Sequence, residues 1–436
     1  MKKVILYHPA THHERFYSFY WIPYSLLTIA SVIADNYDVV IIDDNLEDND
    51  INYKELTDNC LCVGITAMTG HQITGGLQFA EKIRCHNPDI PIIWGGTHAT
   101  ILTDETIQSP LVDIVVRGQG ELPFKELIKR IDLKQSLSGV KGVSYKEKGT
   151  IIHNEKNPLY DKSAFPVLPW HLIDIRRYLR NDPKIGSKIL NYISSQGCPF
   201  GCTFCSEVAL YDRKWKTYGV ERIMSDIRYL IEFGGANAIK FYDANLFVNL
   251  DVVFKMADIC INEKFDITWA ASGHPKTLMN LTKEKWALLS KSKCVRLLIG
   301  AESGSQNALN LIKKGITPQI IENLARKCSD YGIVGSFTFI VGFPNCSDDL
   351  EIEKTIKLAS KVREIDRNHD VKIHFYAPYP GTPLYTEACK AGFKTPEGLQ
   401  SWSNYDYYCV GTPWIKKEYE KIIHSFNSDN SPYVHL

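Results

Sequence analysis

Three cysteines lie close together in the segment "SSQGCPFGCTFCSE", which covers residues 194–207. Cys198, Cys202 and Cys205 follow a C-x3-C-x2-C spacing, and glycine stands beside the first two. Three thiolates are one ligand short of a structural zinc site, and no histidine lies near them in sequence to favour a catalytic one. Iron–sulfur clusters are commonly held by cysteines in such local runs, and a cubane with three protein ligands keeps one iron open. The spacing therefore favours a cluster that binds a substrate over zinc or unligated thiols.

The cysteine loop follows the first strand of a βα repeat that begins at about Lys188. The expected strands cover 189–194, 238–243, 267–272, 295–300, 336–342 and 371–377. Helical stretches separate them, for instance 221–233 and 319–331. About six such units form a partial (βα)6 barrel of the TIM type, shorter than the full barrel. Because the chemistry of such barrels sits on the loops after their strands, we expect the cysteine loop to lie in an active site.

The first 150 residues predict a separate α/β domain. Its expected strands cover 3–7, 38–42, 61–66, 91–96 and 112–116, with helices at 75–84 and 122–131. The strands are continuous apolar runs, as in parallel sheets covered on both faces, so we expect a doubly wound, Rossmann-like domain at 1–150. A hairpin turning at Lys148–Gly149 ends it. We expect a linker at 151–187, the barrel at 188–390 and a short C-terminal extension at 391–436.

The expected carboxyl ends of three strands in the first domain carry similar loops. These loops read "TAMTGHQITGG", "GGTHAT" and "RGQGE", and ligands of doubly wound sheets bind at this edge. Glycine allows close backbone approach, and threonine and histidine supply short hydrogen bonds. None of the loops is the G-x-G-x-x-G fingerprint of a nicotinamide site. The loops therefore either bind a large, flat ligand decorated with amides or form tight turns.

Composition limits the classes of partner. Lysine plus arginine equals aspartate plus glutamate at 50 each, so we expect a small-molecule or peptide substrate and no nucleic acid. The apolar run of "MKKVILYHPA" is too short for a signal peptide, and "WIPYSLLTIASVIA" is too short for a membrane span. We expect the second segment to form a buried helix begun near Pro23, and the protein to be cytoplasmic. In a reducing compartment the twelve cysteines are free thiols or metal ligands.

The motifs resemble one enzyme family along most of the chain. "CPFGCTFC", with an aromatic residue before its last cysteine, resembles the signature of radical S-adenosylmethionine enzymes. "GAESGSQNALNLIKKGIT", "FIVGFP" and "YPGTPLY" look like that family's strand-end segments, and "GGTHAT" and "VVRGQGE" resemble its N-terminal cobalamin-binding module. The resemblance covers roughly residues 1–390. The sequence is therefore identified as a member of the cobalamin-binding-domain radical S-adenosylmethionine enzymes.

The resemblance implies three cofactors. Cys198, Cys202 and Cys205 would hold a [4Fe-4S] cluster whose fourth iron is chelated by S-adenosylmethionine. An electron from the cluster would cleave S-adenosylmethionine to methionine and a 5′-deoxyadenosyl radical, which removes hydrogen from an unactivated carbon. The N-terminal domain would bind cobalamin. An electron donor such as flavodoxin or ferredoxin is implied as a partner.

The resemblance also implies roles for individual residues, although each could instead be an ordinary strand-end or turn residue. Phe204 would lie beside the adenosine, and Glu302, the candidate catalytic residue, would contact the ammonium or ribose together with Ser303. Gly342 would let the backbone approach the adenine, and Asp243 would face the same opening. The candidate cobalamin-binding residues are Thr66, Met68, Thr69, His71, Gly95, Gly96, His98, Gly118, Gly120 and Glu121.

One departure and several rival functions remain open. "TGHQITG" lacks the aspartate of the D-x-H-x-x-G motif, so we expect a cobalt without a protein histidine ligand, or a domain that binds nothing. The function has a leading hypothesis and several alternatives. The leading hypothesis is a methyltransferase that uses two S-adenosylmethionine molecules. The alternative is a radical rearrangement, cyclisation or oxidation without methyl transfer. Methylthio transfer and a non-catalytic cobalamin or metal carrier are weaker. The aromatic stretch "SWSNYDYYCVGTPW" either caps the barrel mouth or packs on the outside of the barrel.

Overall fold

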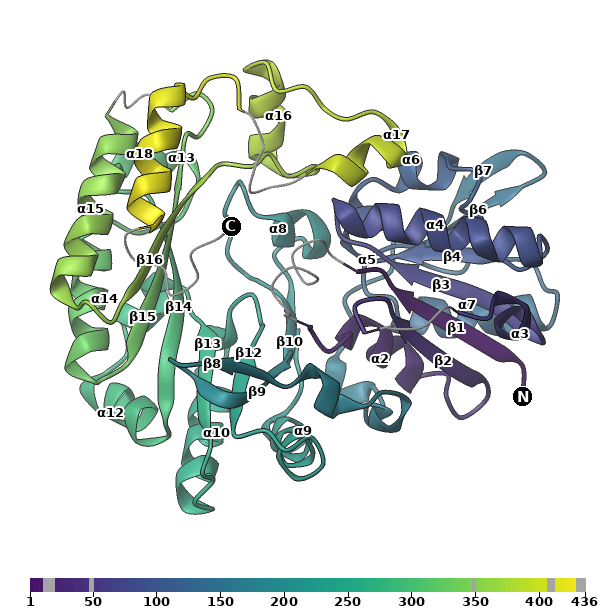
Figure 1. Cartoon of the computed structure of the whole chain (residues 1–436), viewed down its shortest axis with the longest axis horizontal. Helices are drawn as coiled ribbons and strands as arrows, with labels where there is room; N and C mark the ends of the chain where they lie inside the picture. The colour runs from purple at the N-terminus through teal and green to yellow at the C-terminus, as the bar shows by residue number, and fades with distance from the viewer. Residues whose placement is uncertain (11–19, 47–50, 347–349, 406–411, 429–436) are drawn as a thin grey trace. The chain divides into compact units, whose positions relative to one another are not determined.

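A computed structural model describes residues 1–10, 20–46, 51–346, 350–405 and 412–428. Within these residues the chain forms two compact units. The first comprises residues 1–178 and the segment 395–405, and the second comprises 179–394 and the described residues from 412 onward. Figure 1 labels the helices and strands. No helix among the described residues is long and apolar enough to cross a membrane.

The first unit contains a seven-stranded sheet among its described residues, in the order β2-β1-β3-β4-β5-β6-β7. Its strands are β1 (Lys3–His8), β2 (Asp38–Asp43), β3 (Cys60–Thr66), β4 (Ile92–Gly95), β5 (Ile114–Val116), β6 (Val143–Glu147) and β7 (Thr150–His153). Strands β1 to β5 are parallel, and β6 and β7 form an antiparallel hairpin at one edge. The five parallel strands and the hairpin turn at Lys148–Gly149 confirm the sequence predictions.

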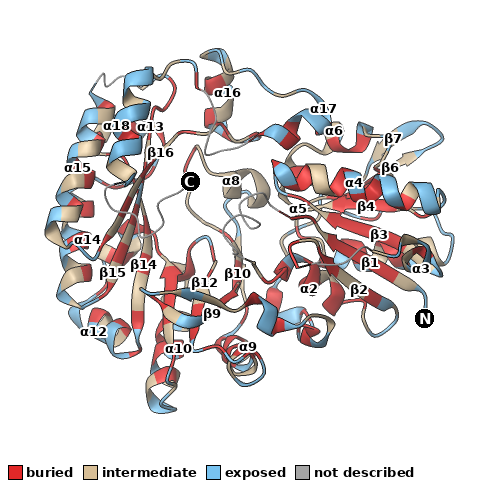
Figure 2. Cartoon of the chain, in the orientation of Figure 1, coloured by how far each residue is buried: buried red, intermediate tan, exposed pale blue. Residues whose placement is uncertain are grey.

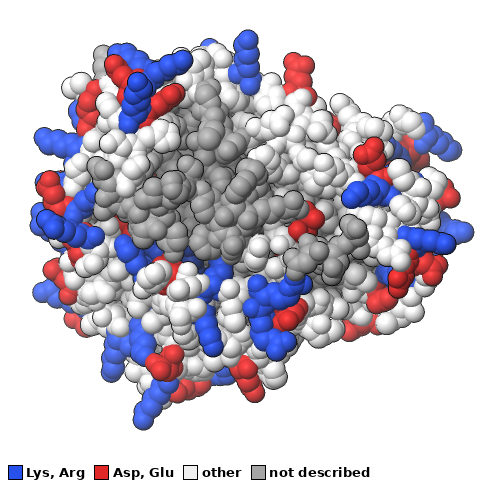
Figure 3. All heavy atoms as spheres, viewed as in Figure 1, with Lys and Arg blue, Asp and Glu red and all other residues white. Residues whose placement is uncertain are grey.

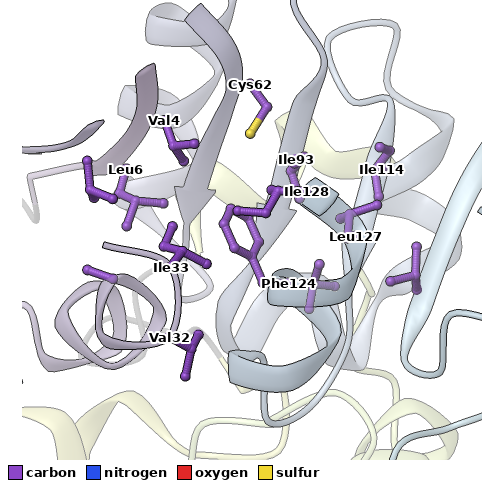
Figure 4. Packing of buried hydrophobic residues seen from close by; sticks show 14 of the residues in the cluster. Val4, Leu6, Val32, Ile33, Cys62, Ile93, Ile114, Phe124, Leu127 and Ile128 are labelled. Carbon is purple, nitrogen blue, oxygen red and sulfur yellow. The ribbon is translucent and has the colours of Figure 1, made fainter. Parts of the chain in front are cut away.

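Helices cover both faces of this sheet (Figure 1). They are α2 (Tyr24–Ser31), α3 (Tyr53–Thr57), α4 (His71–His86), α5 (Gly96–Ile101), α6 (Thr103–Gln108) and α7 (Glu121–Asp132), followed by the 3-10 turns η1 (Lys162–Ala164), η2 (Trp170–Leu172) and η3 (Ile175–Tyr178). Helix α2 begins directly after Pro23, as predicted. Figure 4 shows one core layer, in which Phe124 and Leu127 of α7 pack on Leu6 and Cys62 of the sheet. Helix α4 lies on the other face, where Phe79 stacks on Tyr7.

The second unit is a partial barrel. Its described sheet has the order β16-β15-β14-β13-β12-β9-β8, with β8 (Arg180–Asp182), β9 (Gly186–Tyr192), β12 (Ala238–Phe241), β13 (Thr268–Ser272), β14 (Cys294–Glu302), β15 (Val334–Val341) and β16 (Asp370–Phe375). All pairs from β9 to β16 are parallel, which confirms the six predicted strands. Strand β8 was not expected from the sequence; it is short, polar and antiparallel to β9.

Helices cover the outer face of the barrel sheet (Figure 1). The helices of this unit are α8 (Ser206–Tyr211), α9 (Val220–Glu232), η4 (Leu246–Val248), α10 (Leu250–Asn262), α11 (Pro275–Met279), α12 (Lys283–Lys291), α13 (Gln306–Leu311), α14 (Pro318–Asp330), α15 (Glu351–Ile365), α16 (Pro383–Lys390) and α18 (Lys417–Ser428). Of these, α9, α10, α12, α14 and α15 lie on the outer face. Strand residues that point toward these helices, such as Phe241, Trp269, Phe337 and Phe339, are at most 1% exposed. Figure 2 shows that the helices, too, bury the side that faces the sheet and expose the opposite side.

Candidate active site

The cysteine loop leaves the carboxyl end of β9 through a short ribbon. Its strands β10 (Ser195–Gly197) and β11 (Trp215–Thr217) pair antiparallel on either side of the loop and α8. Asp243, just beyond β12, accepts hydrogen bonds from the Ser194 backbone N–H (3.1 Å) and hydroxyl (2.6 Å) and from the Ser195 hydroxyl. Asp243 is 2% exposed. Its carboxylate therefore anchors the base of the loop.

Neighbouring strand-end segments hold the rest of the loop. The Thr203 N–H donates to the Ile312 carbonyl and the Thr203 carbonyl accepts from the Leu384 N–H, both at 3.0 Å. Phe200 stacks on His274, with ring centroids 3.7 Å apart and planes at 5°. His274 follows β13 and caps α11 by accepting from the Lys276 N–H. These contacts fix the loop from three sides, although "CPFGC" by itself predicts only flexibility.

The three thiols are shielded from solvent. Cys202 is 8% exposed, and Cys198 and Cys205 are partly buried. Burial raises the pKa of all three, that of Cys205 to about 12, so metal binding must displace their protons. Among the described residues no group of three or more His, Cys, Asp or Glu side chains is arranged around a single ion. A cubane spreads its ligands over different irons, so this triad suits a cluster.

A buried ion pair lies next to the cysteine loop. Lys314 Nζ donates to Glu302 Oε1 at 2.7 Å, and the side chains are 8% and 7% exposed. Burial acts to lower the pKa of Lys314, but Glu302 and Cys202 outweigh it and the pKa is raised. Glu302 ends β14 at a break in strand register and has a φ of 62°, which is uncommon outside glycine. Gly300 leaves the space that the pair fills, because a Cβ there would lie 2.2 Å from Glu302 Oε1.

The remaining sequence-predicted barrel residues have different surroundings. Phe204 is partly buried and packs obliquely on Phe343, with centroids 6.3 Å apart. Ser303 is fully buried and donates to Glu351 Oε1 at 3.1 Å, so it belongs to an internal network. Gly342 has a φ of 75°, and a Cβ there would lie 2.3 Å from Ile415. Ile415 therefore fills the space beside the Gly342 Cα, and the approach of adenine to this backbone stays a prediction.

The strand-end loops of the first unit contain two buried polar atoms that suit a ligand. His98 is fully buried and its Nδ1 lies 3.0 Å from the Thr69 hydroxyl, while Nε2 has no hydrogen-bond partner among the described residues. Burial lowers the pKa of His98 to about 4, so the ring is neutral at pH 7. Glu121 is 2% exposed, and its Oε1 also lacks a described partner. Such atoms fit a ligand with amide groups, because a buried polar atom without a hydrogen bond costs free energy.

The other candidate residues of these loops differ in exposure. Met68 is 46% exposed and His71 is exposed, whereas Thr66, Gly118 and Gly120 are partly buried. Gly96 has a φ of 88°, and a Cβ would lie 2.8 Å from the Ala67 carbonyl oxygen, so the backbone itself requires this glycine. Gly95 is different. Its φ is −144°, and a Cβ there would meet only the Val116 carbonyl oxygen at 3.7 Å.

A segment far along the chain joins the first unit at these loops. It contains α17 (Gly398–Ser401) and η5 (Trp402–Asn404). Trp402 lies edge-on to His98 and its Nε1 donates to Glu105 at 2.8 Å, while the Tyr405 carbonyl closes over Gly70. These two aromatics therefore pack within the first unit, and both alternatives for their contact with the barrel stay predictions. Trp414, in contrast, donates to the Gly342 carbonyl at 2.9 Å. Tyr407, Tyr408 and Cys409 lie outside the described residues.

Comparisons with known proteins agree with the division of the chain into two units. The family model described as "Radical SAM superfamily" matches residues 192–359, and the "B12 binding domain" model matches residues 17–128. An uncharacterised methyltransferase of Pyrococcus horikoshii is 32% identical over 372 residues, which are 84% of this chain and 78% of the relative. The chain belongs to the cobalamin-binding radical S-adenosylmethionine enzymes. It is a radical S-adenosylmethionine enzyme, and its cofactors are a [4Fe-4S] cluster, S-adenosylmethionine and cobalamin.

Two further relatives of the enzyme are more distant. The anaerobic magnesium-protoporphyrin IX monomethyl ester cyclase of Rubrivivax gelatinosus is 23% identical, over 80% of this chain and 63% of the relative. The solved structure of the radical S-adenosylmethionine methyltransferase TsrM from Kitasatospora setae superposes with a TM-score of 0.71 at 15% identity. That match covers 91% of this chain and 80% of TsrM, and it supports the fold alone.

Two residues beside the enzyme's cysteine loop escaped the sequence analysis. Lys314 lies within "LNLIKKGIT", where its buried position is indistinguishable from that of its exposed neighbour Lys313. His274 follows a predicted strand, and a histidine at a strand end was the available signal. Neither residue can be assigned to the active site from sequence alone, because the assignment requires knowing which strand ends lie next to the cysteine loop.

Proposed function

We propose that the enzyme transfers a methyl group to an unactivated carbon of a small-molecule or peptide substrate. The main support is the buried cysteine triad at the strand ends, beside the Glu302–Lys314 pair, in a chain that also carries a B12-binding domain. Bound cluster, S-adenosylmethionine and cobalamin would together supply an organic radical and a methyl group. The chain's own residues bind these groups, orient them and exclude water from them.

Each part of the barrel site has a role in this proposal. Cys198, Cys202 and Cys205 bind three irons of the cluster. Lys314 places a buried positive charge beside the thiolates. This charge balances their negative charge, which would be costly in low-dielectric surroundings without a partner. Glu302 holds Lys314 and presents its second carboxylate oxygen to the polar end of S-adenosylmethionine. Phe204 lies beside the adenosine, and Asp243 positions the loop.

The loops after β3, β4 and β5 bind cobalamin in this proposal. His98 Nε2 and Glu121 Oε1 are suited to the amide groups of the corrin side chains. The Thr69 contact and the low pKa of His98 keep its ring neutral and oriented. Trp402, which packs edge-on against His98, further limits the movement of the ring.

Replacing Gly95 with leucine should expel cobalamin without unfolding the domain. The backbone at Gly95 accepts any residue and the nearest protein atom leaves room, so the new side chain would take space that the cofactor needs. We expect cobalamin retained through gel filtration to fall at least about tenfold, a loss of about 1.4 kcal/mol or more in binding. The melting temperature without cobalamin should stay unchanged.

Gly118→Leu is the matched comparison. Gly118 has a φ of 71°, so leucine there strains the backbone and should lower the melting temperature as well as cobalamin retention. Full cobalamin retention in the Gly95→Leu variant would place the cofactor elsewhere.

The products distinguish methyl transfer from the rival reactions. A methyltransferase of this design consumes two S-adenosylmethionine molecules for each product. S-Adenosylhomocysteine and 5′-deoxyadenosine should therefore appear in comparable amounts when substrate is turned over anaerobically under reducing conditions. Turnover that yields 5′-deoxyadenosine with no S-adenosylhomocysteine would instead establish a cyclisation, rearrangement or oxidation. Among these alternatives, cyclisation is supported by the similarity of the chain to the cyclase of Rubrivivax gelatinosus.

A further inference from the structure

The inner face of the barrel sheet, which we call the lumen face, carries charged and polar side chains in addition to a small apolar cluster that includes Ile189 and Ala238. Paired residues of parallel strands point to the same side, so the register places Lys240, Ala270 and Arg296 in one row. Arg296 also donates to the Ser336 hydroxyl at 3.1 Å, across to β15. The inside of a full TIM barrel is filled by layers of branched apolar residues. The lumen face of this barrel is chemically different and requires its own explanation.

Ion pairs close the lumen at the amino ends of the strands. Arg296 pairs with Asp182 at 2.9 Å and with Asp370, and Lys184 also pairs with Asp370. Asp182 belongs to β8 and Asp370 to β16, the two edge strands of the open sheet. The network therefore joins the two edges of the partial barrel through Arg296 and Lys184, and it balances these two cations with two carboxylates.

The lumen face above this floor carries further cations, Lys240 and Lys372. Thr338 is exposed although it lies inside β15, and it is paired with Gly300 and Lys372 on either side. Ala270, in the row of Lys240 and Arg296, adds no polar or bulky side chain to this part of the lumen face. Lys240 is partly buried and its ammonium lies 4.7 Å from the ring centroid of Tyr242.

Three titratable side chains on the lumen face have lowered pKa values. The pKa of Lys240 is lowered to about 7, by burial first and then by Arg296 and Arg180, against the opposing effect of Asp182 and Asp370. Burial also lowers the pKa of Lys372, on which Arg296 acts in the same direction and Asp370 in the opposite one. His374, beyond Lys372 on β16, has its pKa lowered to about 4 by burial and then by Lys372. Burial is the larger cause in each case, and repulsion from neighbouring cations adds to it.

We propose that the lumen binds an anionic group of the substrate, a carboxylate or a phosphate, through Lys240, Arg180 and Lys372. The proposal rests on the proposed function, because it makes the lumen the substrate chamber. An anion placed among these cations relieves their repulsion and is held by charge-assisted hydrogen bonds. The floor network then sets how deep the anion can enter, and the rest of the substrate extends toward the cysteine loop at the strand ends.

The test is the reactivity of Lys240 toward a trace of acetic anhydride, read by mass spectrometry on the reconstituted holoenzyme. The reagent acylates the neutral amine, and a bound anion favours the protonated amine. If an anion raises the pKa of Lys240 by about one unit, acylation at about pH 7 slows roughly fivefold. Sulfate represents a phosphate group and malonate a carboxylate, each against sodium chloride of equal ionic strength. Whichever slows acylation more identifies the class of anion.

Matched variants make the outcome specific. Lys372→Gln should weaken the protection of Lys240, whereas Lys357→Gln, the same change on the exposed side of α15, should leave it unchanged. Equal acylation of Lys240 with and without both anions would overturn the proposal. Failure of Lys240 to react at any pH without an added anion would overturn it too. The acylation measurement needs no turnover. The anion proposal can therefore be refuted while methyl transfer is established, and methyl transfer can be refuted while anion binding is established.

Discussion

Replacing Cys202 with alanine is expected to abolish both the iron–sulfur cluster and the cleavage of S-adenosylmethionine. The wild-type protein, reconstituted anaerobically, should hold about four irons per chain. With two thiolates left, the cluster loses the ligand that lies deepest in the protein, at 8% exposure. The visible absorbance of the iron–sulfur cluster and the formation of 5′-deoxyadenosine should both be lost. The fold should persist, because the loop remains held through Thr203 and Asp243.

Cys260→Ala is the control for this variant. Cys260 is also buried, at 5% exposure, but it lies within α10, away from the loop. The substitution removes the same sulfur and should cost about 1 kcal/mol of stability at most, with cluster and cleavage intact. A Cys202→Ala protein that keeps its cluster and still cleaves S-adenosylmethionine would refute the ligand assignment.

Removing either partner of the Glu302–Lys314 pair should have the second largest effect. Glu302→Gln leaves a buried ammonium, and Lys314→Met leaves a buried carboxylate, each without its partner. Breaking a buried pair in this way costs about 3–5 kcal/mol. We expect a clearly lower melting temperature and at least about a hundredfold slower cleavage of S-adenosylmethionine, about 2.7 kcal/mol in the barrier. Lys313→Met, beside the pair but exposed, should change neither.

The double variant separates stability from chemistry. Replacing both partners with apolar residues, Glu302→Leu with Lys314→Met, removes both buried charges and should recover most of the lost stability. Cleavage of S-adenosylmethionine should stay low, because the charge beside the thiolates and the carboxylate for the cofactor are both gone. Recovery of cleavage together with stability would reduce the pair to a structural role. Gly300→Ala should resemble the single variants, since its Cβ would displace Glu302.

Local patterns in the sequence were sufficient for the architecture and for the family, and they predict the cluster ligands. The apolar runs of β1 to β5 and of the barrel strands are long, bounded by turn residues and alternate with helical periodicity, so each element can be recognised from its own residues. The cysteine spacing is equally local. Strand β8 and the β10–β11 ribbon were missed, because "RND", "SQG" and "WKT" are short and carry no apolar period.

Only the tertiary structure decided which residues share a site. Glu302 and Lys314 are twelve positions apart, and their pairing depends on the register break in β14 and on the gap at Gly300. Trp402 reaches His98 because the chain returns to the first unit after the barrel, and nothing near Trp402 in sequence encodes that return. The lumen charges converge from strands that are distant in sequence but adjacent in the sheet. Long-range register is set by packing of the whole sheet, whereas a motif reports only the residues within it.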